Sequence, residues 1–100
     1  MRQTYAVTWS KDDGHVYAGQ LDLQFEGLTL RGGSGTETVV EQLAYDELGE
    51  VRRARSVRER VRGHASLVLE LLSGGEISIA SLGQPGALSE VADRLSAACV

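Results

Sequence analysis

Cysteine, histidine, lysine and long apolar runs are all scarce in this chain, and their scarcity excludes several classes of protein. Cys99 is the single cysteine, so no disulfide can form within the chain. The chain has two histidines, and together with this cysteine they cannot supply a metal cluster of the usual ligand spacing. No apolar run approaches the roughly 20 residues that cross a bilayer. We therefore expect no metal site, no cofactor and no transmembrane helix.

The N-terminal stretch MRQTYAVTWSKDDG has no apolar run of signal-peptide length before its first charged cluster. This favours a cytoplasmic protein. With 100 residues, 42% of them hydrophobic, the chain suits a single domain over residues 1–100 with one core. Nine arginines against one lysine, with abundant Ala, Gly, Val and Leu, are typical of a GC-rich bacterium.

Apolar and polar residues alternate over most of the first eighty positions, which is the pattern of half-buried strands. In the cleanest example, Leu21, Leu23 and Phe25 point inward and Gly19 predicts a bulge or a bend. A hairpin is expected at Gly27, where glycine tolerates positive φ, and GGSG at 32–35 reads as a flexible loop. The predicted strands cover about 4–10, 15–25, 28–32, 38–45, 50–56, 65–72 and 76–82.

Near the C-terminus the period changes from two to that of a helix. Leu88, Val91, Ala92, Leu95 and Cys99 fall at i, i+3, i+4, i+7 and i+11, which makes one apolar stripe. The preceding segment contains the only proline of the chain, which suits the first turn of a helix. The pattern predicts one amphipathic helix over about 86–98.

The stretch from Leu48 to Val61 fits two periods. As a helix it would present a stripe of apolar residues surrounded by arginines, and as a strand over 50–56 it would be ordinary. Gly49 near the start of the helix would cost about 1 kcal/mol relative to alanine. This favours the strand.

The order of these elements resembles the pleckstrin-homology-like (PH-like) fold in its small bacterial, GRAM-like style. The segments that carry the likeness are YAGQLDLQFEGLTLRG, LAYDELGEVR, LVLELLSGGEISIAS and LSEVADRLSAA, which are distributed between residues 17 and 98. The resemblance implies an α+β, mainly β fold in which seven antiparallel strands form two packed sheets capped by one C-terminal α-helix. Trp9 departs from the family pattern, because the familiar tryptophan of eukaryotic members lies in the final helix.

The resemblance also implies a ligand mouth at the loops SKDDGH, GGSGTE and SGG. With their flanks, these loops contain Lys11 and Arg31 against Asp12, Asp13, Glu37 and Glu76. A phosphoinositide headgroup needs several converging cations, because each phosphate demands charge-assisted hydrogen bonds. We therefore expect no phosphoinositide binding at this mouth.

Six arginines instead gather within eleven positions of a chain whose net charge is -4. The candidate partner-binding residues are Arg52, Arg53, Arg55, Arg58, Arg60 and Arg62. They form either a solvated sheet edge or an electrostatic dock for an acidic partner segment or a nucleic-acid backbone. Nucleic acid is the weaker alternative, since the protein is acidic overall and no aromatic residue lies among the arginines.

Catalytic patterns are absent from the sequence. His15 and His64 fall in a turn and a loop, no serine lies in a G-x-S-x-G motif, and GGSGTE lacks the lysine of a phosphate-binding loop. We predict a non-catalytic protein-interaction module or adaptor, for which homo-oligomerisation is compatible with the sequence. The alternative is a binder of an anionic ligand, either a membrane surface or a nucleic acid, through residues 52–62, and an enzyme without a recognisable motif ranks third.

Overall fold

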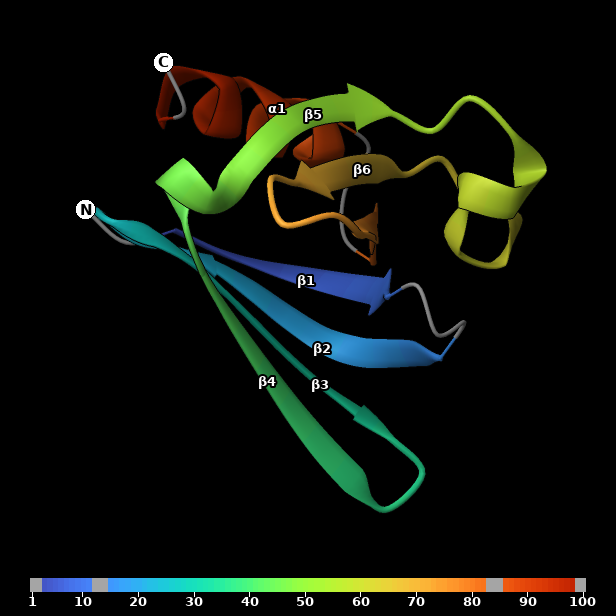
Figure 1. Ribbon diagram of the computed structural model, residues 1–100. Coiled ribbons are helices and arrows are strands. Elements are labelled where there is room, and N and C mark those ends of the chain that lie inside the picture. Colours follow the sequence, from blue (N-terminus) through green and yellow to red (C-terminus); the bar gives the residue numbers. More distant parts are fainter. Residues whose placement is uncertain (1–2, 12–14, 83–85, 99–100) are drawn as a thin grey trace.

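The computed structural model describes residues 3–11, 15–82 and 86–98 (Figure 1). Its strands are β1 (Gln3–Ser10), β2 (Val16–Leu23), β3 (Gly27–Ser34), β4 (Glu37–Ala44), β5 (Leu48–Arg53), β6 (Leu67–Leu71) and β7 (Glu76–Ser81), and they are followed by the helix α1 (Ala87–Ala98). Three short 3₁₀ helices, η1 (Tyr45–Glu47), η2 (Val57–Glu59) and η3 (Val61–Gly63), lie on either side of β5. The mainly β composition with seven antiparallel strands and one C-terminal helix is confirmed.

The seven strands form one sheet in the order β4-β3-β2-β1-β7-β6-β5, which curls into a half-barrel. The prediction of two packed sheets is therefore wrong. The reason is that β1 pairs with two neighbours, with β2 along its whole length and with β7 through Val7–Ser10 against Ser78–Ser81. This second pairing joins the N-terminal and C-terminal halves into a continuous ladder. The architecture is consistent with a PH-like fold.

The core lies on the concave face of the half-barrel and under α1. Trp9, Leu21, Leu30 and Ile79 are fully buried, as their alternation along the strands requires. From α1, the stripe of Leu88, Val91 and Leu95 is buried in the same cluster. The helix contacts β5 and β7, so it covers one side of the curled sheet (Figure 1). No helix in the part of the chain that the structure describes is long and apolar enough to cross a membrane.

Two of the three glycine predictions are wrong and the third is right only in part, because the glycines serve close packing between strands. Gly19 is no bulge: it pairs in register with Gly32, and a Cβ built on it would lie 2.0 Å from the Arg31 carbonyl oxygen. The hairpin expected at Gly27 is present, because Leu23 of β2 pairs with Leu28 of β3 and the Gln24 amide donates to the Gly27 carbonyl. Gly27 is however the first residue of β3 and does not have a positive φ, and a Cβ there would lie 2.2 Å from the Leu43 carbonyl oxygen. The GGSG loop is mostly strand, because β3 continues to Ser34 before the chain turns.

Phe25 was expected inside and is instead 89% exposed. Strand β2 ends at Leu23, and the amide of Gln24 donates to the Gly27 carbonyl, so Phe25 stands at a turn rather than on the inward face. The stretch from Leu48 to Val61, which fitted either a helix or a strand, begins as strand β5, and this strand is shorter than predicted. It ends at Arg53, after which the chain leaves the sheet through η2 and η3.

Candidate functional site

Residues 54–66, which we call the arginine loop, fold back over the outer face of the sheet. The amide of Ala54 donates to the Ser66 carbonyl at 2.9 Å and closes the base of the loop. Val61 is 2% exposed, and η3, on which it lies, contacts β1 and β7. Val68 and Ala80, which are buried but lie outside the main core cluster, belong to the same face. The loop therefore has a small apolar anchor of its own.

Ser66 fixes the same loop by hydrogen bonds. Its buried side-chain Oγ accepts from the Val61 amide at 2.9 Å and donates to the His64 carbonyl at 2.8 Å. One hydroxyl thus satisfies two backbone groups that the 3₁₀ turn leaves unpaired. The loop is held in one conformation at its apex as well as at its base.

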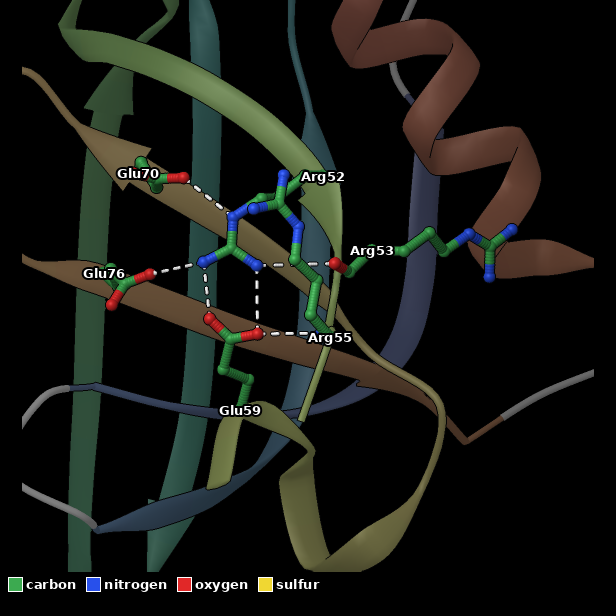
Figure 2. A network of polar contacts seen from close by, with 6 residues as sticks. All are labelled: Arg52, Arg53, Arg55, Glu59, Glu70 and Glu76. Carbon is green, nitrogen blue, oxygen red and sulfur yellow. Dashed lines mark hydrogen bonds and ion pairs between the residues drawn. The ribbon is translucent and has the colours of Figure 1, made fainter. Parts of the chain in front are cut away.

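Arg52 ties the start of the loop to the sheet through three carboxylates (Figure 2). Its Nε donates to Glu70 at 2.8 Å, and its terminal nitrogens donate to Glu76 at 3.0 Å and to both oxygens of Glu59. The side chain of Arg52 is only 14% exposed. Because Glu59 lies in η2 whereas Glu70 and Glu76 lie on β6 and β7, this network pins the arginine loop to the sheet.

The hydrogen bonds of this network also shift the pKa values of its carboxylates and of Arg52. Hydrogen bonds from Arg52, and then from the backbone amide of Arg55, lower the pKa of Glu59 to about 2. The hydrogen bond from Arg52 likewise lowers the pKa of Glu70, and its carboxylate partners raise the pKa of Arg52. All of these groups are therefore charged at neutral pH.

Between the arginine loop and the sheet lies a cavity of about 540 Å³, which we call the loop cavity. It is lined by Ser10, Lys11 and Val16 near the β1–β2 connection, by Ser56, Arg58, Glu59, Arg60, Val61 and Arg62 of the loop, and by Glu76 and Ser78 of β7. Its volume is in the range of small-ligand sites. Three stretches far apart in the sequence meet there.

The charges of the described lining are unbalanced. Arg58, Arg60 and Arg62 are exposed at its rim, and within the described residues no hydrogen bond or ion pair engages their guanidinium groups. The two carboxylates of the lining, Glu59 and Glu76, both accept from Arg52. The described part of this cavity is thus a local positive region on a chain of net charge -4.

Arg62 has an unusual backbone. It has φ 51° and ψ 35°, in the left-handed region, and Gly63 follows with φ 79°. A non-glycine residue in this region costs roughly 1 kcal/mol, and such strain is often kept at ligand sites. Here it turns the chain at the rim of the loop cavity.

The six arginines that were expected to form one binding surface lie in different surroundings. Arg52 is used in the network, and Arg53 donates to the Ser89 hydroxyl on α1. Arg55 is exposed outside the lining of the cavity, and its backbone amide donates to Glu59. Only Arg58, Arg60 and Arg62 line the cavity. Sequence reasoning missed Ser10, Ser56 and Ser78 as cavity residues, because nothing in the local pattern marks them.

A second cavity of about 350 Å³ lies at two of the three loops that the resemblance assigned to the ligand mouth, and it shares Lys11 and Glu76 with the loop cavity. It is lined by Lys11, Glu41, Leu71, Gly74, Gly75, Glu76 and Ile77. Lys11 forms an ion pair with Glu41, so the one cation among the described residues of this lining already has a carboxylate partner. Asp12 and Asp13, counted in the prediction for this mouth, lie outside the described residues.

The remaining predicted residues are dispersed. His15 and His64 are exposed, and His15 meets the Tyr17 ring edge-on. Within the described ranges, no group of three or more His, Cys, Asp and Glu side chains could hold a metal ion. Cys99 lies outside those ranges.

Comparison with known proteins gives a likeness of fold. No protein-family model matches the chain, and no curated protein matches it significantly. Among solved structures, the C-terminal domain of an unknown protein from Leishmania infantum is similar, with a TM-score of 0.67 at 14% sequence identity. The match covers 94% of this chain and 82% of that one. At this identity the likeness concerns the fold alone.

Proposed function

We propose that this chain is a small PH-like, non-catalytic interaction module that docks an acidic segment of a protein partner at the loop cavity. The observation that carries the proposal is that Arg58, Arg60 and Arg62 line one cavity while their guanidinium groups have no partner in the described chain. Guanidinium groups bind carboxylates through paired hydrogen bonds, and their weak hydration favours this at interfaces.

The composition of the lining favours carboxylates over other anions. Glu59 and Glu76 lie among the cations, so a multiply charged phosphate group would meet negative charge as well as positive. Carboxylates spaced along a peptide can reach the arginines one at a time. Among the lining residues that the structure describes, no aromatic side chain can stack on a base, which argues against single-stranded nucleic acid.

The anchoring of the loop supports the same function. Arg52, Val61 and Ser66 hold the loop against the sheet, so the rim arginines project from an ordered backbone. A preordered site loses less conformational entropy on binding. Exposed cations at the rim would also speed association with an acidic partner by electrostatic steering.

The test is binding of a fluorescent peptide rich in Glu and Asp to the parent and to the triple variant Arg58→Gln, Arg60→Gln, Arg62→Gln. We expect parent binding that weakens steeply as salt rises past 0.1 M, where the Debye length is about 10 Å, and at least tenfold weaker binding by the triple variant. The control is Arg55→Gln combined with Arg94→Gln, which removes exposed arginines outside the cavity and should bind like the parent.

Competition separates the alternatives. Inorganic phosphate that displaces the peptide far better than acetate at equal ionic strength would replace the acidic partner with a phosphate ligand. Equal peptide binding by the parent and the triple variant would contradict the proposal. A triple variant that unfolds much more easily than the parent would assign the three arginines a structural role instead.

A further inference from the structure

Strand β4 is one end of the sheet, and its outer edge is open. It pairs with β3 over its full length, from Glu37 opposite Ser34 to Ala44 opposite Gly27, without a break in register. Among the described strands β3 is its only neighbour. Figure 1 shows β4 as the outermost strand, on the side of the sheet away from α1. A row of backbone amides and carbonyls therefore faces away from the sheet.

The two edge strands of the sheet differ in how well they are protected from pairing with a strand of another chain. The other edge, β5, has a register shift between Leu48 and Glu50, contacts α1 and continues into the arginine loop. In contrast, β4 is eight residues long and has no bulge, no proline and no lysine. Of the usual means of preventing edge pairing it has only inward-pointing charges, Glu37 and Glu41, and the charge of Glu41 is compensated by Lys11. Its outward-facing side chains, Thr38, Val40, Gln42 and Ala44, are uncharged and exposed, and Val40 is 53% exposed.

We propose that β4 is a self-association edge: it pairs antiparallel with β4 of a second copy of this chain, with Val40 opposite Val40, and joins two half-barrels into one continuous sheet. The inference is independent of the loop cavity, because none of the residues that line that cavity lies on β4.

The distribution of glutamates selects this register. In a continuous sheet the inner faces of the two copies lie on the same side, so each inward-facing residue must pair with an inward-facing residue. For two identical antiparallel strands, this requires the twofold axis to pass through one residue of each strand and not between two residues. Centring the pairing on Val39 would place Glu37 opposite Glu41, and centring it on Glu41 would place that residue opposite its own copy. Like charges directly opposite are destabilising.

Centring on Val40 avoids both contacts and keeps the pairing long. It aligns residues 37–43 of the two strands and places Thr38 opposite Gln42 on the uncharged outer face. On the inner face, Glu41 lies opposite Val39 of the second copy, and its charge is already compensated by Lys11 of its own chain. Centres further along, at Thr38 or Gln42, leave fewer residues paired within the strand.

Cysteine cross-linking tests the register. In a Cys99→Ser background, Val40→Cys places two thiols on directly opposed residues, whose Cα atoms lie about 4.5–5.5 Å apart in antiparallel pairs and within disulfide reach. Mild oxidation should give a covalent dimer of Val40→Cys. Thr38→Cys and Gln42→Cys should each give no covalent dimer alone, although their strands still pair, and should cross-link when mixed. Equal cross-linking of all the single variants would show random collision and overturn the proposal.

A matched charge substitution tests the edge itself. Light scattering coupled to size exclusion should give a dimer mass for the parent, loss of the dimer for Val40→Lys and an unchanged dimer for Val57→Lys, whose valine is 77% exposed on the arginine loop. Circular dichroism checks that Val40→Lys keeps the fold. A parent that is monomeric at every soluble concentration, or a folded Val40→Lys variant that remains dimeric, would overturn the proposal. The triple arginine variant should dimerise like the parent.

Discussion

At the scale of single residues, the arginines differ in what surrounds them. Arg52 is nearly buried and bonded to three carboxylates, whereas Arg58 and Arg60 project from the loop that those carboxylates hold. A cation with such partners cannot be removed without leaving partly buried charge unpaired, whereas an exposed one can. The same residue type therefore has a structural role at one position and is available for binding a few residues later.

The ionisation of Glu59 gives a pH prediction. Its pKa is about 2 in the folded chain against an ordinary 4.5, so the folded state binds this proton less readily than the unfolded state. The stabilisation is therefore present above about pH 4.5 and is lost as pH falls toward 2. In urea unfolding at a series of pH values, Glu59→Gln should lower the free energy of unfolding at neutral pH and flatten its dependence over this window.

The control for this prediction is Glu26→Gln, which changes an exposed glutamate at the β2–β3 turn. Its pH profile should follow that of the parent. A Glu59→Gln variant with the parent's slope between pH 2 and 4.5 would show that the Arg52 network does not stabilise the fold.

Two adjacent glycines of β3 give a second prediction at this scale. A Cβ at Gly32 would lie 2.8 Å from Tyr17 Cβ and 2.9 Å from Trp9 Nε1, whereas at Gly33 the nearest atom is the Glu37 carbonyl oxygen at 3.4 Å. Gly32→Ala should therefore destabilise the protein by about 1–3 kcal/mol through overpacking, and Gly33→Ala should change its stability by less than about 1 kcal/mol.

Denaturant unfolding followed by Trp9 fluorescence measures both effects at once. Trp9 is the single tryptophan and is fully buried, and its ring lies 4.6 Å from that of Tyr17 between centroids. The emission of the folded state should shift for Gly32→Ala and stay constant for Gly33→Ala. Equal stabilities of the two variants would contradict the packing described for this corner.

At the scale of elements, α1 is held by its apolar stripe. Leu95 is fully buried in the core cluster, together with Leu88 and Val91. Leu95→Ala should lower the free energy of unfolding by about 2–4 kcal/mol, because it leaves a cavity in a domain with little stability to spare. The control Ser96→Ala, at the neighbouring exposed position, should stay within about 0.5 kcal/mol of the parent. A similarly small change for Leu95→Ala would mean that the helix does not pack there.

The arginine loop shows how an element can be ordered without regular secondary structure. Its fixed points are a buried valine, a buried serine and a guanidinium network, each from a different part of the segment or the sheet. None of these requires a repeating backbone pattern, and that is why no periodicity revealed the loop. Its position over the outer face also explains the burial of Val68, whose side of β6 would otherwise meet solvent.

At the scale of the whole molecule, charge decides what the protein should not bind. The chain has net charge -4, and the mouth expected from the PH-like resemblance has one lysine among its described lining residues, already paired with Glu41. We expect no co-sedimentation with phosphoinositide vesicles at physiological salt, because a headgroup phosphate needs several converging cations. Headgroup-selective binding that survives the triple arginine substitution would show that this mouth is a lipid site after all.

The sequence by itself determined the local structure: period-two alternation predicted β2 with Leu21 and Leu23 inward, and the later stripe predicted α1 with Leu95 inside. Such patterns are readable because neighbouring residues on one element share a face. Only the tertiary structure decided that β1 pairs with both β2 and β7, which makes one curled sheet instead of two. It also brought Lys11 and Ser78 to the arginines of the loop. These juxtapositions depend on contacts between residues on different elements, which leave no trace in the local pattern of either partner.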